Sequence, residues 1–234
     1  MNVRRLSLEG GARQARGAAV VIDVFRAFTC APLLFDLGVS EIRFVARPEE
    51  GLALKREDPE RILIGEVNGA PIPGYDLGNS PKEILACPPG RFRGGRVVQR
   101  TSSGVQGVLI ALERAAPVLP ASFVNARATA RHLLRLNPPE VSILAMGRNM
   151  KEPAPEDELC ARYLASLLGE CAYDHREALR ELLFSPMTQL FTSGRYPYLP
   201  AEDAVYCLQR DLFDRVLCAQ KEGDAVIVRP ISAP

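Results

Sequence analysis

Polar side chains with the chemistry of an active site come directly after several short apolar runs of the sequence. They form four clusters: Asp23 with Arg26, Glu66, the stretch 75–81 with Asp76 and Asn79, and the turn Arg100–Gly104. In an open α/β sheet, ligands bind at the carboxyl ends of the strands, so these clusters lie where such a sheet would place its site. Carboxylates combined with guanidinium and hydroxyl groups are typical of a site that binds a metal ion and an anion.

The turn Arg100–Gly104 is rich in groups that bind anions. A helix that begins near Gly104 would present unpaired N–H groups and the positive end of its dipole. Its three hydroxyl residues, Thr101, Ser102 and Ser103, would add further donors. The alternative is purely structural, because Ser and Thr are preferred N-cap residues of helices. Arg100 and residues 101–104 are therefore candidate substrate-binding residues.

Three carboxylates, Asp23, Glu66 and Asp76, could converge on a metal ion. Mg²⁺ takes oxygen ligands and usually keeps several of its waters, so a few carboxylates suffice to hold it. Taken singly, Asp23 is also explained as a helix N-cap, and Glu66 as a surface charge. Together with an anion-binding turn, the three favour metal-assisted chemistry on a phosphorylated acid, and they are the candidate catalytic residues.

The elements that must position these clusters alternate between strands and helices. The apolar patterns predict an α/β fold, a three-layer α/β/α arrangement with a mainly parallel or mixed sheet. We expect one domain over residues 1–234, and two lobes that divide near residues 115–125 are the alternative. Strands are predicted at 18–23, 41–45, 61–65, 96–100, 119–124, 141–146, 215–219 and 225–229. Helices are predicted at 26–37, from 48 onward, and at 81–87, 104–115, 126–136, 155–168, 175–184 and 201–207.

Composition narrows the class of protein. The chain has 234 residues and a formal net charge of +1, which argues against a broadly basic nucleic-acid-binding protein. Its two histidines are too few for a three-histidine metal site. The six cysteines form no C-x-x-C pair, and no apolar run approaches the 18 residues of a membrane span. We therefore expect a cytoplasmic protein with reduced cysteines.

Several familiar catalytic motifs are missing or incomplete. Residue 25 is Phe, so Asp23 does not begin the Asp-x-Asp motif of aspartyl-phosphate phosphatases. The stretch from Cys87 to Arg93 has the spacing of a cysteine phosphatase, but Pro88 and Pro89 remove two N–H groups that its phosphate loop needs. The sequence contains no P-loop motif and no G-x-S-x-G motif. Without a nucleophile candidate, direct attack by a metal-activated water is favoured.

The order of the polar clusters resembles that of the 2-phosphosulfolactate phosphatase family over nearly the whole chain. The D-L-G-N-S-P string at 76–81 is the most specific match. The matching segments are 21–27, 65–66, 74–81, 101–107, 122–126 and 156–161. The resemblance implies Mg²⁺-dependent hydrolysis of 2-phospho-3-sulfolactate to 3-sulfolactate and phosphate, a step towards coenzyme M. Val105 and the pair Val67–Asn68 depart from the family's pattern, at positions where a different residue would change contacts to the substrate.

Roles follow from this resemblance. Mg²⁺ is expected on Asp23, Glu66 or Asp76, and Glu156 and Asp157 are interpreted equally as further ligands or as acidic residues of a helix start. Arg26, Arg100 and Arg148 are expected to hold the anionic ends of the substrate, and Asn79 either orients the substrate or braces its loop. The expected partner is a small phosphorylated acid, without nucleic acid or membrane; a homo-oligomer is left open. Two alternatives remain: a phosphatase of another small phosphorylated acid, and a non-catalytic anion-binding relative.

Overall fold

The computed structural model describes residues 1–231, in which strands and helices alternate as the sequence predicts. The strands are β1 Asn2–Ser7, β2 Ala18–Ile22, β3 Glu41–Phe44, β4 Ile62–Val67, β5 Ala70–Pro71, β6 Arg96–Arg100, β7 Val118–Ala121, β8 Glu140–Ala145, β9 Val216–Glu222 and β10 Ala225–Ile231. The helices are α1 Leu8–Ala12, α2 Ala27–Asp36, α3 Pro48–Glu57, α4 Pro81–Leu85, α5 Gly104–Ala111, α6 Ala126–Leu136, α7 Pro155–Leu167, α8 His175–Leu183, α9 Pro186–Thr192 and α10 Ala201–Cys207.

The strands of the described residues form one mixed sheet in the order β1-β8-β2-β7-β9-β10-β3-β6-β4-β5. Strands β1, β8, β2 and β7 are mutually parallel, and so are β3, β6 and β4. The antiparallel hairpin β9–β10 lies between the two groups and pairs antiparallel with β7 on one side and β3 on the other. Followed across the sheet, the two parallel groups therefore run in opposite directions.

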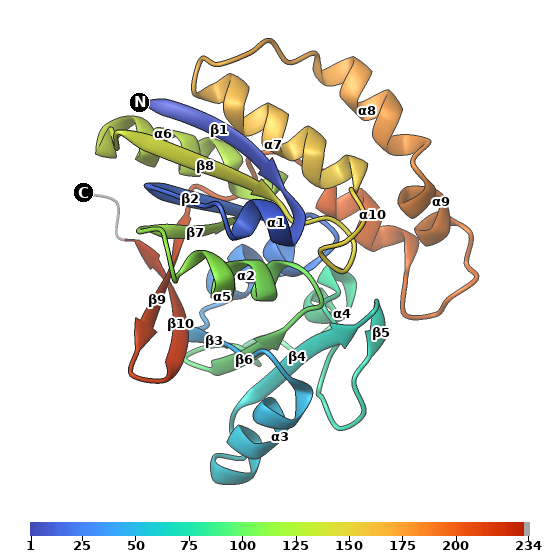
Figure 1. The fold of residues 1–234 in the computed structure, drawn as a ribbon. Helices are drawn as coiled ribbons and strands as arrows, with labels where there is room; N and C mark the ends of the chain where they lie inside the picture. The colour runs from blue at the N-terminus through green and yellow to red at the C-terminus, as the bar shows by residue number, and fades with distance from the viewer. Residues whose placement is uncertain (232–234) are drawn as a thin grey trace.

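The twist of the sheet brings the carboxyl ends of both groups together. Counted across the sheet, β6 is the fifth strand after β2. Neighbouring strands are rotated by about 20–25° relative to each other, so the strand direction turns by roughly 100–125° between β2 and β6. The sheet consequently curls around α2 and α5, with β2, β7 and β8 on one side and β3, β6 and β4 on the other (Figure 1). Asp23 after β2 and Thr101 after β6 meet as a result, with 3.3 Å between their side-chain oxygens.

Helices cover both faces of the sheet. The main core packs α2 and α5 against the concave face, and it includes Phe28, Val105 and Ile64. A second core packs α6, α7 and α8 against the opposite face of β2, β7 and β8, and a small third core places Leu54 of α3 on β4 and β6. The predicted α/β/α fold with a mainly parallel, mixed sheet is confirmed.

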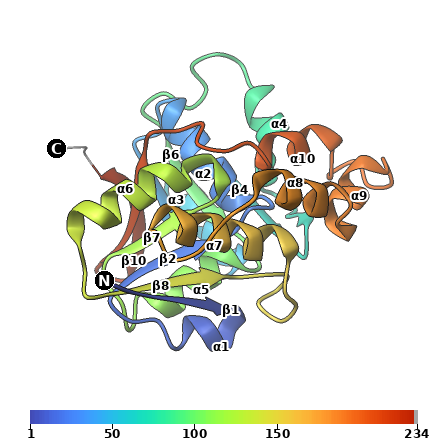
Figure 2. The ribbon, with the colours of Figure 1, turned by 90° about the horizontal axis from the view of Figure 1, so that it is seen from above.

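The C-terminal helices lie together at one side of the molecule. Figure 2 shows α8, α9 and α10 grouped beside α4. The segment that follows β2 reaches this group of helices, because its Arg26 pairs with Asp203 of α10. No helix within residues 1–231 has both the length and the apolar character to cross a bilayer. The single domain over residues 1–234, and its alternative division near 115–125, stay predictions.

Candidate active site

The carboxylate of Asp23 caps helix α5. Its Oδ2 accepts a hydrogen bond from the N–H of Gly104 at 2.9 Å and one from the Thr101 hydroxyl at 3.3 Å. A Cβ on residue 104 would lie 2.5 Å from that oxygen, so only glycine allows this approach. The hydroxyl groups of the turn do not cap the helix; the carboxylate does.

The carboxylate of Glu66 organises the same turn from the end of β4. Its Oε1 accepts from the Ser102 N–H at 2.6 Å, and its Oε2 accepts from the Gly69 N–H at 2.5 Å and the Ser102 hydroxyl at 3.2 Å. Arg100 completes the arrangement by donating from Nη1 to the Glu66 carbonyl and the Ser102 hydroxyl. The Ser103 hydroxyl has no hydrogen-bond partner within residues 1–231, so it stays available to a ligand.

Helix α7 brings two more carboxylates to this edge of the sheet. Pro155 begins the helix, where a missing N–H costs nothing, and acidic residues in the first turn favour its dipole. Asp157 accepts from the N–H groups of Val24 and Gly147, each at 2.8 Å, and so braces the ends of β2 and β8. Glu156 is different, because its Oε2 is buried and has no hydrogen-bond partner among residues 1–231.

Burial and the charge of neighbouring carboxylates raise the pKa values of Asp23, Glu156 and Asp157. Desolvation and the charge of Glu66 raise the pKa of Asp23 to about 6. Desolvation and the charge of Asp23 raise the pKa of Glu156 to about 7, although Arg148 opposes the shift. Desolvation, Asp23 and Glu156 likewise hold the pKa of Asp157 well above its usual range. We call Asp23, Glu66, Glu156 and Asp157 the carboxylate cluster.

The carboxylate cluster suits a hydrated divalent cation. Within residues 1–231, no three His, Cys, Asp or Glu side chains converge as a ready-made metal site. Mg²⁺, however, is usually held by one or two carboxylates, substrate phosphate oxygens and water. Asp23 and Glu156 are two such carboxylates: they repel each other, and one has an unpartnered oxygen. A cation beside them would offset the repulsion, so these residues fit the group that the resemblance implies.

Asp76 lies apart from the carboxylate cluster. The segment 76–77 runs alongside the start of β4, where the Asp76 carboxylate accepts from the Leu63 N–H at 2.7 Å and pairs with Lys55 at 2.5 Å. Glu66 is three residues further along that strand, a distance of about 10 Å at 3.3 Å per residue. The structure therefore does not bring Asp76 to the other candidate ligands.

The remaining candidates occupy three different positions. Arg26 is buried and pairs with Asp203 of α10 at 2.7 Å. Asn79 is buried too: it donates to the Arg100 carbonyl at 3.0 Å and accepts from Gln99 at 2.9 Å, so it braces its loop against β6. Arg148 is exposed and lies 3.5 Å from Glu152. Asp203 was not a candidate from sequence, where it reads as an ordinary first-turn acid of a short helix.

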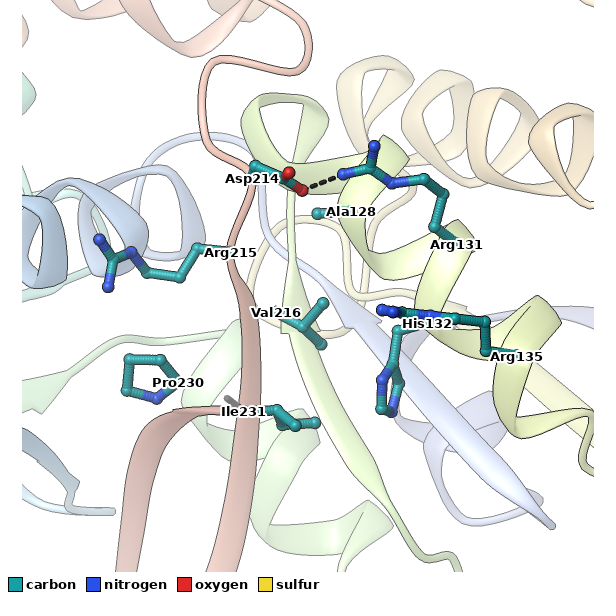
Figure 3. A pocket seen from close by; sticks show the side chains of 9 residues that line it. All are labelled: Ala128, Arg131, His132, Arg135, Asp214, Arg215, Val216, Pro230 and Ile231. Atoms are coloured by element: carbon teal, nitrogen blue, oxygen red, sulfur yellow. Dashed lines mark hydrogen bonds and ion pairs between the residues drawn. The ribbon is translucent and has the colours of Figure 1, made fainter. Parts of the chain in front are cut away.

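A separate hollow of about 350 Å³ lies beside α6 and the hairpin strands, and Figure 3 shows its lining. It shares no residue with the carboxylate cluster. We call it the basic hollow, because three arginines and a histidine line it beside the acid Asp214; they are Arg131, His132, Arg135 and Arg215. Arg131 pairs with Asp214, the hollow's one carboxylate (Figure 3).

Comparison with known proteins decides the family. The profile of the 2-phosphosulpholactate phosphatase family matches residues 7–222. The chain belongs to this family. A probable 2-phosphosulfolactate phosphatase of Bacillus subtilis is 32% identical over 216 residues, which cover 91% of each chain. One of Carboxydothermus hydrogenoformans is 33% identical over 85% of this chain and 84% of its own, and one of Deinococcus radiodurans is 40% identical over 55% and 52%. The resemblance that the sequence motifs indicate is confirmed.

Proposed function

We propose that this chain is a Mg²⁺-dependent phosphatase that hydrolyses 2-phospho-3-sulfolactate to 3-sulfolactate and phosphate. The activity for which its relatives are named supports the substrate, and the carboxylate cluster supports the chemistry. The observation that carries the proposal is the pair Asp23 and Glu156, two buried carboxylates of which the first raises the pKa of the second through its charge. Ionising both carboxylates of such a pair is costly unless a cation lies between them.

Asp23 and Glu156 would hold the cation. Bound there, Mg²⁺ would polarise a phosphoryl oxygen and lower the pKa of a coordinated water. Glu66 and Asp157 have both carboxylate oxygens engaged by the protein, so their part is to fix the turn 101–104 and the ends of β2 and β8.

The protein's own donors would orient the phosphoryl group. The Ser103 hydroxyl is unpartnered, and the Arg100 guanidinium uses Nε and Nη1 but not Nη2 for the protein contacts of residues 1–231. Both lie on the turn that Asp23 and Glu66 hold in place. Phosphoryl transfer depends mainly on positioning and on stabilising charge, which these groups provide. The attacking water would bond to phosphorus and lose a proton, the bond between phosphorus and the oxygen on C2 would break, and that oxygen would take up a proton to become the hydroxyl of 3-sulfolactate.

A panel of phosphorylated acids tests the proposal. We expect the protein with Mg²⁺ to release phosphate fastest from 2-phospho-3-sulfolactate, and EDTA to abolish the release. Faster release from another phosphorylated acid would favour the first alternative, a phosphatase of a different substrate. Tight anion binding without release from any member of the panel would favour the non-catalytic alternative. A cytoplasmic location and a homo-oligomeric state stay predictions.

A further inference from the structure

The guanidinium of Arg26 is buried but only partly used. Its side chain is 5% exposed, and its Nη1 donates to Asp203 Oδ2 at 2.7 Å and to the Tyr198 carbonyl at 2.9 Å. The other edge, Nε and Nη2, donates to no atom of residues 1–231, and neither nitrogen is sealed from solvent. A nearly buried arginine thus presents one open edge with two nitrogens.

The C-terminal helices hold this guanidinium in place. Asp203 is completely buried and also accepts from the Ser80 hydroxyl and the Lys82 N–H, each at 2.9 Å. The ring of Phe191 lies 5.4 Å from the Arg26 guanidinium carbon. Asp203 therefore joins α10 to the loop before α4 and fixes the orientation of Arg26 at the same time.

We infer that the Nε–Nη2 edge of Arg26 binds the non-reacting anionic end of the substrate, a carboxylate or a sulfonate, and that Asp203 is the positioning residue for this edge. The inference rests on the proposed function for the identity of the substrate. The two nitrogens of one guanidinium edge match two oxygens of such a group, a geometry that lysine does not offer.

The direction of the two side chains separates this end from the reacting one. Asp23 and Arg26 are only three residues apart, but Asp23 turns to the start of α5 and Arg26 turns to α10 and Tyr198. The phosphoryl group is placed by the carboxylate cluster and the turn 101–104. Arg26 is left to contact the other end of a small acid that spans the two positions.

Arg26→Lys tests the inference directly, because it keeps the charge and removes the two-nitrogen edge. We expect KM for 2-phospho-3-sulfolactate to rise roughly 10- to 100-fold while kcat changes less than about 3-fold. Inhibition by 3-sulfolactate should weaken by the same factor, and inhibition by inorganic phosphate should stay unchanged. Arg176→Lys, on the exposed face of α8, is the matched control.

Two comparisons make the outcome decisive. A KM increase that is also seen with 2-phospholactate assigns the edge to the carboxylate, whereas an increase confined to the sulfonated substrate assigns it to the sulfonate. Asp203→Asn should raise KM in the same direction with little change in kcat, and a melting curve checks that it folds. If it does not fold, Arg26→Lys alone decides.

Two results would overturn the inference: an unchanged KM in Arg26→Lys, or a fall in kcat together with weaker inhibition by inorganic phosphate. Calorimetry can measure the binding of 3-sulfolactate to the protein, and this measurement requires no turnover. An Arg26-dependent affinity in a protein that releases no phosphate would therefore contradict the proposed function while leaving this inference standing.

Discussion

The carboxylate cluster and the basic hollow both concentrate charge of one sign, but they differ in burial and in pairing. Asp23, Glu156 and Asp157 are at most 4% exposed; Asp23 raises the pKa of both Glu156 and Asp157, and Glu156 also raises that of Asp157. In the basic hollow, Arg131 is more than half exposed and pairs with Asp214, and Arg215 lies 3.8 Å from Asp36.

This difference shows which charges can do chemistry. Exposed ion pairs contribute little, because water screens them and their side chains remain mobile. Buried groups of like charge are costly, and proteins retain them at functional sites. The basic hollow contains an exposed ion pair, whereas the carboxylate cluster holds buried charges of the same sign, at an electrostatic cost to the fold.

The largest expected effect is that of Asp23→Asn. The change removes a charge from the carboxylate cluster while keeping the shape, so kcat/KM should fall at least ~100-fold, about 2.7 kcal/mol of transition-state stabilisation. Steady-state phosphate release measures it. Asp214→Asn makes the same chemical change in the basic hollow and should leave kcat/KM unaffected. Equal losses of kcat/KM in the two variants would show that the carboxylate cluster is no more important for catalysis than the basic hollow.

Gly104→Ala should come next. The new Cβ would lie 2.5 Å from Asp23 Oδ2, so the carboxylate must shift. A displacement of this kind costs roughly 10- to 100-fold in rate, measured as phosphate release at saturating Mg²⁺. Gly10→Ala is the matched control, since a Cβ there meets no atom within 4 Å. Normal activity in Gly104→Ala would mean that the Asp23–Gly104 contact has no catalytic importance.

Glu156→Gln should separate stability from activity. At pH 8, above the raised pKa of Glu156 of about 7, the change removes a buried charge near Asp23, so the metal-free protein should become more stable by about 1 kcal/mol or more, while phosphate release falls. Urea unfolding in EDTA measures the first effect. A lower free energy of unfolding in Glu156→Gln would show that the charge of Glu156 does not destabilise the fold.

Asp76→Asn should have the opposite effects, a lower stability and a nearly unchanged rate of phosphate release. Asp76 pairs with Lys55 and accepts from the Leu63 N–H, away from the carboxylate cluster. We expect a loss of about 1 kcal/mol in unfolding free energy and a rate within a few-fold of the wild type. A large loss of rate without loss of stability would return Asp76 to the catalytic residues.

The smallest effect concerns the basic hollow. Burial and the charge of Arg135 lower the pKa of His132, which disfavours its charged form in the fold. The unfolded chain then binds more protons, so this histidine reduces stability as the pH falls below its usual pKa near 6.5. Arg135→Ala should raise the pKa of His132, as followed by NMR titration, without changing phosphate release; a change in activity would connect the hollow to the site.

Much of the fold could be predicted from the sequence, because buried parallel strands are continuous apolar runs. Ala18–Ile22 is an example, and Ile143–Ala145 is the apolar end of another such strand. Strand β1 was missed, since this edge strand carries Arg4 and Arg5 and lacks an apolar run. Helix α9 was missed as well, because its seven residues include a proline and two threonines, which have low helix propensity. The predicted strand 119–124 ends at Ala121 and is followed by a single 3₁₀ turn.

The candidate site was only partly predictable for a physical reason. Strand ends identify Asp23 and Glu66, but the hydrogen bonds that engage both oxygens of Glu66 and Asp157 depend on a sheet curl that no local pattern encodes. The position of Asp76 depends on the register of its loop along β4. Asp203 lies 177 residues from Arg26, so its pairing could not be deduced from sequence spacing.

Metal binding tests the central claim most directly. Mn²⁺, used as a paramagnetic probe with Mg²⁺ as competitor, can be followed by electron paramagnetic resonance without substrate. We predict that Asp23→Asn and Glu156→Gln each weaken Mn²⁺ binding at least ~10-fold, whereas Asp76→Asn and Asp214→Asn leave it unchanged. Unaltered Mn²⁺ affinity in both Asp23→Asn and Glu156→Gln would contradict the account.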